Sequence, residues 1–449
     1  MAYYTVGTPY MDDNVKGKNS PFYLGITFSL RIIGPTLGFL LSSFCLKYYE
    51  DPMMNPGFDN SDPKWVGAWW IGFLVLGLAI FLVSFPLALF PKHLAVHDEM
   101  TTEEEINISK NSFYELLPAL KKLMKNPILM FHTMSITFQI NGLFGYLVFM
   151  PKYIESQYRK TASSASFFSG NVTLAAMVIG VFLSGFCIHK LKPKARSLVG
   201  YMLFVELCAA VALLSAFFTG CESPSLQEHT ASLLSVEPKA CNSNCTCDSH
   251  IFSPICDVNN QMHFSPCSAG CYSSSKSGNG KMIFHNCSCI LPSDEDLKYS
   301  ALKGFCPQEC SMFVAYIAII TVAKMLSATV RVGNVLINLR CVDEQDKTLA
   351  LGAVEVVISV FATIPFPLFY GYIINKACIL WDKSCEYQGN CWLYDNTLFR
   401  NYLHSVAVGF MFLAICCDSV VFVMSPRMRD LYGENKKPAA NIELTATDS

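Results

Sequence analysis

The most informative chemistry in this chain comes from ionisable side chains placed inside long apolar segments. Lys324 and Arg331 lie seven residues apart, two turns of a helix, in a segment of Ala, Ile, Val, Met and small polar residues. Arg31 lies midway through another apolar segment, just before Gly34-Pro35, where a helix break would free backbone groups for a ligand. Because a charge inside a bilayer costs at least ~2.5 kcal/mol on insertion scales, these cations are functional candidates and predict an anion-binding site.

Two further polar residues repeat the same spacing. His132 and Gln139 are seven residues apart in a third apolar segment, so they share one face of a helix and join the candidate site. Two structural alternatives stay open at this stage. Arg331 would then extend toward the membrane surface or pair with Glu355 of a neighbouring segment, and His132 would be an ordinary packing histidine.

Several functional classes are excluded by what the sequence lacks. It contains no Walker motif, no Gly-x-Ser-x-Gly and no His-Glu-x-x-His, so we expect no catalytic residue, no cofactor and no metal site, and no enzyme. The formal net charge is -2 without a long basic run, so we expect no nucleic-acid partner.

The elements that must position these residues are helices in a membrane. The chain has 449 residues, of which 52% are hydrophobic and 15% charged, a balance too apolar for an ordinary soluble protein. About 20 apolar residues cross the hydrocarbon layer as a helix, and a membrane barrel is disfavoured because the apolar runs show no alternation. The sequence predicts an all-α polytopic protein in contact with the lipid bilayer. The eight expected spans are Phe22–Leu46, Gly67–Phe90, Pro127–Met150, Ser164–Ile188, Ser197–Thr219, Ser311–Ile337, Leu349–Ile374 and Tyr402–Met424.

Cysteine usage indicates which loops face the outside. Eleven of the 20 cysteines lie between Cys221 and Cys310, in polar sequence typical of a disulfide framework in an oxidising compartment. With a cytosolic N-terminus, this loop follows the fifth span and lies outside, and both termini are cytosolic. The sequons at Asn244 and Asn286 lie in the same loop and are expected to be glycosylated, whereas that at Asn107 falls in a cytosolic loop.

The loop after the second span carries a helical pattern of its own. Ser112 and Glu115 form a capping box, and apolar residues follow at helical spacing up to Pro127. We expect an amphipathic helix along the inner membrane surface, with a simple extension of the third span as the alternative. The apolar positions are Leu116, Leu117, Leu120, Leu123 and Met124.

A tryptophan-rich string at the start of the second span carries a family resemblance. Taken alone, its tryptophans indicate an aromatic belt at the membrane surface. As a whole, the string closely resembles the signature of the organic anion transporting polypeptides, and further stretches around Asp12, Arg340 and Trp381 resemble the same family. The signature residues are Trp65, Gly67, Ala68, Trp69, Trp70, Gly72, Phe73 and Leu74.

The resemblance implies a fold of the major facilitator superfamily, located in the plasma membrane as a multi-pass protein. Family members have twelve helices, and the signature lies at their sixth. The resemblance therefore implies eight of the twelve helices here, family helices five to twelve, with the first four absent. The spans that carry Arg31, His132 and Lys324 then match family helices five, seven and ten, which line the central cavity. Glu206 and Asp418 fall on spans that match peripheral helices, where pairing between helices is expected.

The large outer loop resembles the Kazal-like module of the same family. Zinc binding at Cys245-x-Cys247 or Cys287-x-Cys289 is disfavoured because such outer loops oxidise. The resemblance implies bonds from Cys247 to Cys267 and from Cys256 to Cys287 or Cys289. The cysteines expected in disulfides are Cys241, Cys245, Cys247, Cys256, Cys267, Cys271, Cys287 and Cys289.

These patterns divide the chain into six parts. The last two helices of the N-terminal half occupy residues 1–91, and a cytosolic linker with the amphipathic helix occupies 92–126. Three helices of the C-terminal half follow over 127–219, the extracellular Kazal-like domain over 220–310, the last three helices over 311–426, and a cytosolic tail over 427–449.

Two functions remain open on the sequence. The resemblance implies sodium-independent transport of amphipathic organic anions such as steroid conjugates, bile acids, prostaglandins or thyroid hormones, which pair an apolar body with an acidic group. The alternative is a non-transporting, truncated membrane protein that displays its Kazal-like loop as a binding module or protease inhibitor.

Overall fold

The fold is given by a computed structural model of the chain. It describes residues 7–15, 19–51, 53–54, 65–88, 116–221, 247, 252–276, 282–290, 300–306, 310–382, 389–428 and 431. Asn107, Ser112, Glu115, Cys241, Asn244 and Cys245 lie outside the described residues.

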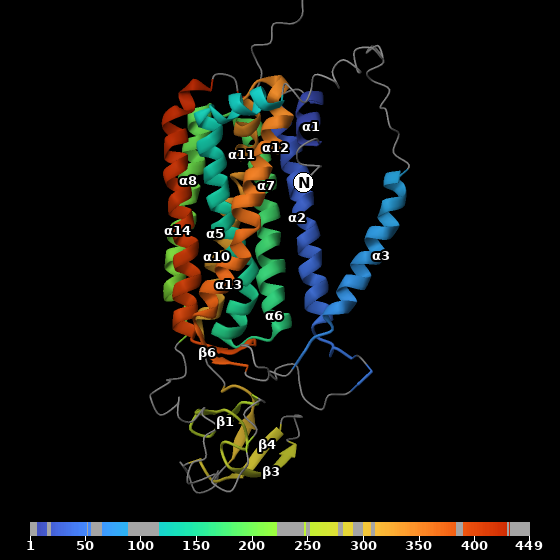
Figure 1. Cartoon of the computed structure of the whole chain (residues 1–449), viewed down its shortest axis with the longest axis vertical. Helices are drawn as coiled ribbons and strands as arrows, with labels where there is room; N and C mark the ends of the chain where they lie inside the picture. The colour runs from blue at the N-terminus through green and yellow to red at the C-terminus, as the bar shows by residue number, and fades with distance from the viewer. Residues whose placement is uncertain are drawn as a thin grey trace, which may run out of the picture.

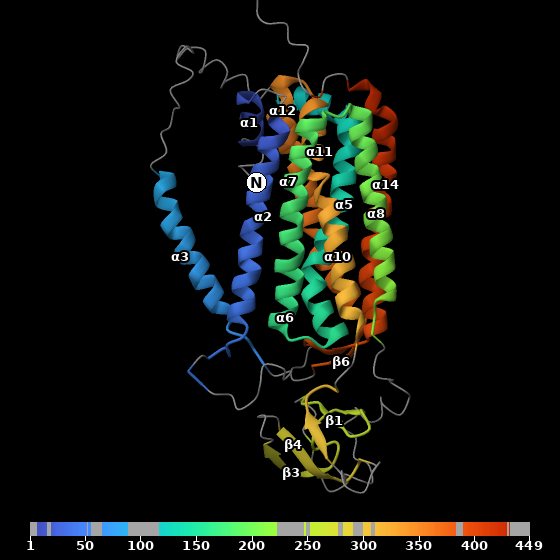
Figure 2. The same ribbon diagram turned by 180° about the vertical axis from the view of Figure 1, so that it is seen from behind.

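Eight helices of the described chain are long and apolar enough to cross a membrane, which confirms the predicted number and type of spans. Seven of them stand side by side as a bundle, while α3 leans away from α2 (Figures 1 and 2). The spans are α2 (Ser20–Cys45), α3 (Trp69–Ala88), α5 (Pro127–Tyr158), α6 (Ala162–Ser166) with η2 (Phe167–Val172) and α7 (Thr173–Leu191), α8 (Ala195–Ser215) with η3 (Ala216–Phe218), α10 (Met312–Ala328) with α11 (Arg331–Arg340), α12 (Lys347–Ile358) with η5 (Ser359–Thr363) and α13 (Pro365–Asn375), and α14 (Asn396–Met424) with η6 (Ser425–Arg427).

Local chemistry explains where the two longest helices begin. The side chain of Asn126 accepts hydrogen bonds from the backbone N–H groups of Ile128 and Leu129, and Pro127 fills the first helical position of α5. Asp395 caps α14 in the same way by accepting from Thr397 and Leu398. Because these caps satisfy N–H groups that a helix start leaves free, both boundaries are fixed by sequence.

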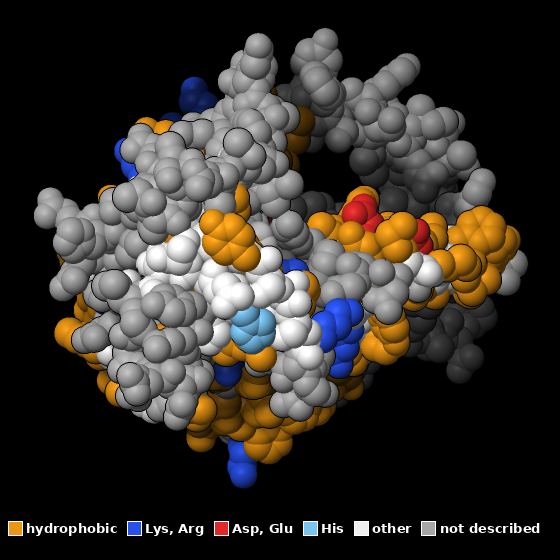
Figure 3. All heavy atoms as spheres, turned by 90° about the horizontal axis from the view of Figure 1, so that it is seen from below, with side chains coloured by type: hydrophobic (Ala, Val, Ile, Leu, Met, Phe, Trp, Pro, Cys, Tyr) orange, Lys and Arg blue, Asp and Glu red, His pale blue; other side chains and the backbone are white. Residues whose placement is uncertain are grey.

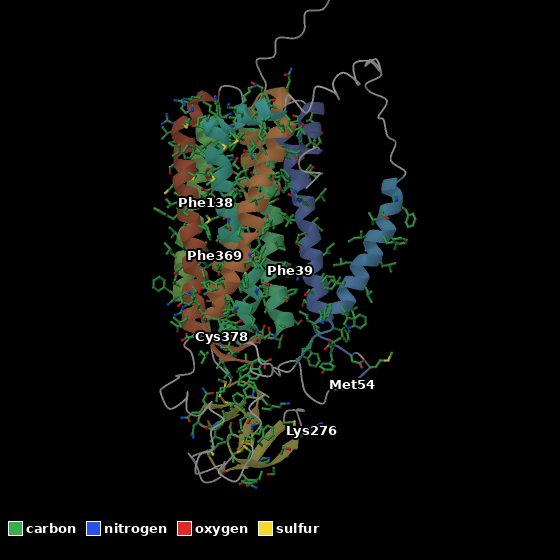
Figure 4. All side chains as sticks on the ribbon, viewed as in Figure 1. Phe39, Met54, Phe138, Lys276, Phe369 and Cys378 are labelled. Carbon is green, nitrogen blue, oxygen red and sulfur yellow. A yellow bond between two sulfur atoms is a disulfide. The ribbon has the colours of Figure 1, made fainter. Side chains whose placement is uncertain are left out.

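The bundle is tied together by aromatic rings and by small residues. The Phe410 ring of α14 lies 6.4 Å from that of Phe138 on α5 and 5.9 Å from that of Phe369 on α13, both labelled in Figure 4. Gly25 of α2 faces Gly185 of α7 so closely that a Cβ on Gly25 would lie 2.9 Å from the Gly185 Cα. Side chains at this crossing are excluded, and α2 is therefore held against α7 backbone to backbone.

One expected feature of α2 is wrong. The helix continues through Gly34 and Pro35 without a break. Because proline has no N–H, the Arg31 carbonyl four residues earlier still loses its helical donor, so a free backbone acceptor exists without a kinked or broken helix.

A disulfide-bonded module follows α8 and lies at one end of the bundle (Figure 1). Its five-stranded sheet has the order β2-β1-β5-β4-β3, and a separate hairpin pairs β6 with β7. Seen from this end, a histidine and Lys or Arg side chains lie near the middle, and hydrophobic side chains extend along the lower and right-hand parts of the view (Figure 3). The strands are β1 (Ile255–Asp257), β2 (Met262–His263), β3 (Cys271–Lys276), β4 (Met282–Cys287), β5 (Ala301–Lys303), β6 (Cys378–Trp381) and β7 (Cys391–Tyr394).

The disulfides agree in part with the pairing implied by the resemblance. Cys247 bonds to Cys267 as expected. Cys256 bonds to Cys306, so the expected bond to Cys287 or Cys289 is wrong. The physical reason is strand order: β1 lies beside β5, which brings Cys256 next to the chain that leads to Cys306. The remaining bonds described are Cys221–Cys310, Cys271–Cys287 and Cys378–Cys391, and Cys289 is disulfide-bonded as well.

Residues 116–124 form a short helix before α5, as the apolar spacing predicted. Leu123 is buried against the bundle, whereas Leu117 and Met124 are exposed. Lys122 on its polar side forms ion pairs with Asp343 and Asp346, and these hydrogen-bonded carboxylates raise the pKa of Lys122 above its usual value. The helix is thus attached to the connection between α11 and α12.

Candidate functional site

Lys324 is a buried cation inside the bundle. Only 4% of the residue is exposed, and its Nζ donates a hydrogen bond of 2.8 Å to the carbonyl of Leu143 on α5. The same nitrogen lies 5.7 Å from the centre of the Tyr146 ring. Among the described residues, no carboxylate is within ion-pair distance of Lys324. An ammonium group has three N–H donors, and the Leu143 carbonyl occupies one of them.

Arg331 lies beside Lys324 but on a separate helix. The expected continuous span is interrupted, because α10 ends at Ala328 and α11 begins at Arg331. The guanidinium lies 5.4 Å from the centre of the Phe144 ring, and its charge acts on Lys324. Two like charges are therefore held near each other on a face that α5 completes.

Side chains from neighbouring helices stabilise the break between α10 and α11. Ser184 of α7 donates to the Thr329 carbonyl, and the Tyr201 hydroxyl of α8 lies 2.7 Å from Thr329 Oγ1. The Thr329 hydroxyl also donates to the Leu326 carbonyl at 2.7 Å. The bonds to the Thr329 and Leu326 carbonyls satisfy backbone acceptors that the end of α10 would otherwise leave without partners, and the Tyr201 hydroxyl holds the Thr329 side chain in place.

Arg31 belongs to a different part of the molecule. It is exposed on α2, and its charge acts on Glu355 of α12. Glu355, an alternative partner of Arg331 on the sequence alone, instead interacts with Arg31. The structure does not bring Arg31 into contact with Lys324.

His132 and Gln139 are also separate from the two cations. Both are buried, and they belong to a polar cluster that joins α5 to α8 and α14. The Gln139 amide nitrogen donates to Glu206 Oε1 and lies 3.4 Å from Asp418 Oδ2. Ser135 Oγ donates to Asp418 Oδ2 at 2.7 Å. We call these five residues, His132, Ser135, Gln139, Glu206 and Asp418, the acidic cluster.

A cluster of aromatic side chains, several of them tyrosines, fills the half of the bundle nearest the disulfide-bonded module. The Tyr146 hydroxyl lies 2.7 Å from that of Tyr316 and 3.2 Å from His404 Nε2. The rings of Tyr153 and Phe399 pack against the same group. The sequence gives no local pattern for this cluster, since its members come from three separate spans, α5, α10 and α14.

Charged residues meet at the opposite end of the bundle in an arrangement that we call the latch. Asp12 on α1 (Thr8–Asn14) accepts two hydrogen bonds from Arg340, at 2.7 and 2.8 Å, and one from Lys347 at 3.1 Å. Burial by itself raises the pKa of Asp12, but the charge of Arg340 and hydrogen bonds from Ser20 and Lys347 outweigh it and hold the pKa below its ordinary value. The latch therefore ties the first helices to α11 and α12.

The signal for this latch was present in the sequence. Asp12, Arg340 and Lys347 each lie in or beside one of the stretches that resemble the transporter family, and their charges are complementary. Their separation along the chain, more than 300 residues between Asp12 and Arg340, hid the pairing.

The tryptophan signature holds the connection between α2 and α3. Trp65 Nε1 donates to the Leu46 carbonyl at 3.0 Å, and Trp70 Nε1 donates to the Glu50 carbonyl at 2.9 Å. A Cβ on Gly67 would lie 2.8 Å from the Leu46 Cα, so only glycine fits there. These contacts give the string a structural role at the end of the two helices.

Two remaining expectations concern modification and metals. Asn286 is exposed on β4, where it adopts a left-handed backbone with φ of 55°. In the part of the chain that the structure describes, no group of three or more His, Cys, Asp or Glu side chains is placed to hold a metal ion.

Comparison with known proteins gives a consistent result. The model of the "Organic Anion Transporter Polypeptide (OATP) family" matches residues 1–399. The chain is 34% identical to solute carrier organic anion transporter family member 74D of Drosophila melanogaster, over 97% of this chain and 54% of that protein. It is 32% identical to member 1C1 of Mus musculus, over 88% of this chain and 61% of that protein. The chain thus spans little more than half the length of these relatives.

Proposed function

Because the chain belongs to the organic anion transporter polypeptide family, we propose that it takes part in sodium-independent transport of amphipathic organic anions across the plasma membrane. The substrates in view are steroid conjugates, bile acids, prostaglandins and thyroid hormones. Its fold is a membrane-spanning helical bundle like that of the major facilitator superfamily, with a Kazal-like disulfide-bonded loop. The proposed orientation has both termini in the cytosol and the disulfide-bonded module outside, where thiols oxidise.

The observation that carries this proposal is the buried ammonium group of Lys324. The residue has no carboxylate within ion-pair distance in the described chain and is attached to α5 by one backbone carbonyl. Two of its N–H donors remain for an anionic head group. A sulfate or carboxylate bound there would also interact with the nearby charge of Arg331.

Aromatic side chains beside the cations suit the apolar part of such a substrate. Phe144 and Tyr146 project from the same turn of α5 and contact Arg331 and Lys324 respectively. Rings and aliphatic groups around a few fixed polar groups are the usual lining of a small-molecule site. In this proposal the cations bind the head group, and the rings bind the hydrophobic body.

Two contacts between the first helices and the rest of the bundle suit the rocking motion of this fold. The close glycine pair at Gly25 and Gly185 lets α2 turn against α7 without side chains in the way. The latch closes the end opposite the disulfide-bonded module through ion pairs, which break and form without loss of covalent structure. Opening the latch would admit substrate from, or release it to, the cytosolic side.

The alternative function, display of a free Kazal-like inhibitor, receives no support from the module's surroundings. The Phe252 ring of the module stacks on Trp392 of β7 at 5.6 Å, and the Phe264 ring lies 6.2 Å from Trp392. Arg159, at the end of α5, lies 4.4 Å from the centre of the Phe305 ring. One face of the module is therefore covered by the helical bundle's own outer loops.

Uptake of a radiolabelled steroid sulfate into cells that express the protein tests the proposed function. Uptake above background should persist when sodium is replaced by choline, and Lys324→Ala should reduce it about tenfold or more at unchanged surface expression, because a charge-assisted hydrogen bond contributes about 1.5–3 kcal/mol. Arg331→Lys should restore only part of the activity lost in Arg331→Ala. Lys152→Ala, which removes an exposed lysine paired with Glu155, is the matched control. Unchanged uptake in both Lys324→Ala and Arg331→Ala would contradict the assigned site.

A further inference from the structure

The acidic cluster contains two carboxyl groups in the interior of the bundle. Glu206 is 2% exposed and Asp418 is 1% exposed, and they interact with each other across the contact between α8 and α14. His132 is fully buried, with its Nδ1 3.5 Å from Asp418 Oδ1. An isolated carboxylate in such surroundings is expensive, and two adjacent ones cannot both stay ionised without compensation.

The described side chains supply too few hydrogen-bond donors for two carboxylates. Ser135 donates one bond to Asp418, and the two amide hydrogens of Gln139 are shared among Ser135, Glu206 and Asp418. Glu206 Oε2 and Asp418 Oδ1 are buried and have no hydrogen-bond partner. Each of these oxygens is an acceptor without a donor.

His132 adds to the shortage of hydrogen-bond donors in the acidic cluster. Its Nε2 lies 3.2 Å from the Asn334 carbonyl, which only accepts, so Nε2 carries the hydrogen. In the neutral ring Nδ1 is then an acceptor, and it faces Asp418 Oδ1, a second acceptor. Both atoms are buried and have no hydrogen-bond partner. One proton placed on either atom would turn this pair of acceptors into a donor and an acceptor.

No lysine or arginine of the described chain neutralises the cluster. The interactions described for Glu206 are with Asp418 and Gln139. The neighbouring elements carry other titratable groups, but the contacts described for the charged ones are elsewhere. On α10, α11 and α12 these groups are Lys324 on Leu143, Arg331 on Phe144, Arg340 on Asp12, and Glu355 with Arg31. On α5, α8 and α14 they are Lys152 with Glu155, Arg196 on Phe422, Arg400 near Tyr153, His404 with Tyr146, and the thiols of Cys208, Cys416 and Cys417.

We propose that Glu206, Asp418 and His132 form a proton-binding site within the membrane-spanning bundle, in which the two carboxyl groups share a proton at neutral pH. The proton comes from water and its uptake involves no other reactant. It supplies the donor that the unpartnered oxygens lack and removes one of the two buried negative charges. A proton also needs no coordination shell, which suits a cluster closed on three sides by α5, α8 and α14. This proposal does not depend on the transport function proposed above.

Infrared spectroscopy of the full chain in lipid nanodiscs tests the proposal directly, because a protonated carboxyl group has a C=O stretch separate from that of a carboxylate. At pH 7 the wild type should show this band, and the double variant Glu206→Gln/Asp418→Asn should lose it. Each single variant should shift the band, since each changes the shared hydrogen bond. Glu155→Gln, which alters a half-exposed carboxylate on the same helix as His132, should leave the band unchanged.

A second measurement covers the case in which the double variant does not fold. Wild-type protein labelled with ¹³C at its Asp carboxyl groups, and separately at its Glu carboxyl groups, should show the band displaced in at least one of the two samples. A wild type without the band at pH 7, or a folded double variant that keeps it, would overturn the proposal.

Discussion

Two buried charged clusters meet α5 at neighbouring stretches, and they have opposite sign. Residues 132–139 contribute to the acidic cluster with Glu206 and Asp418, while residues 143–146 contact Lys324 and Arg331. Both clusters bear the same penalty for charge in a membrane. They differ in how the charge is compensated, because the acidic cluster is crowded with acceptors and Lys324 has donors to spare.

The balance of hydrogen-bond donors and acceptors, more than the presence of charge, therefore distinguishes a ligand-binding site from a cluster that only the protein's own groups satisfy. The acceptors of the acidic cluster face each other, so a proton satisfies them without admitting any larger ligand. The ammonium group of Lys324 is held by a single carbonyl and lies beside aromatic rings, an arrangement suited to an anion with an apolar body.

The largest expected loss of stability comes from the latch, because there a buried carboxylate pairs directly with two cations. Asp12→Ala would leave Arg340 and Lys347, both largely buried, without their carboxylate and should destabilise the protein by about 3 kcal/mol or more. Asp343→Ala is the control: it removes an exposed partner of Lys122 and should cost less than about 1 kcal/mol. Thermal and denaturant unfolding of the purified protein in detergent compares the two. Equal losses would mean that the latch has no special role.

The pH dependence of the latch follows from the lowered pKa of Asp12. Its stabilisation is fully present above the ordinary pKa of an aspartate, about 3.9, and is lost as pH falls through the lower pKa of the folded protein. The difference in stability between wild type and Asp12→Asn should therefore shrink on acidification.

Alanine substitutions in the two clusters should act in opposite ways on stability. Asp418→Ala removes the acceptor of Ser135 and one neighbour of Gln139, so it should cost about 1–3 kcal/mol. Lys324→Ala removes a buried charge and leaves behind a Leu143 carbonyl that lies within α5, so stability should change little or rise. The melting temperatures of the two purified variants, compared with that of the wild type, test both expectations. A large loss in Lys324→Ala would show that this lysine is structural and would remove the contrast between the clusters.

Sequence reasoning predicted the spans well because bilayer thickness sets a length that composition reveals directly. It also selected Lys324 and Arg331 as candidate anion-binding residues, since charges in apolar runs are conspicuous, and that assignment stays a prediction. It missed the break at Thr329 and Val330, because the bonds that stabilise the break come from Ser184 and Tyr201, far away in the chain.

Partners that are distant in the sequence explain the other differences between the predictions and the structure. His132 and Gln139 were grouped with the cations by spacing alone, whereas Glu206 and Asp418, assigned to helix pairing, became their partners only once α8 and α14 were placed. In the same way, the Cys256–Cys306 bond follows from the order of strands in the sheet, and no local pattern of cysteines specifies that order.

The central claim, that Lys324 binds an anionic head group, is tested most directly by equilibrium binding of a steroid sulfate and its neutral parent steroid to the protein in nanodiscs. Wild type should bind the sulfate about tenfold or more tightly than the neutral steroid. Lys324→Ala should lose about that factor for the sulfate and keep its affinity for the neutral steroid within about twofold. If Lys324→Ala binds both ligands as wild type does, or weakens both equally, the buried ammonium group does not recognise the anion and the account is wrong.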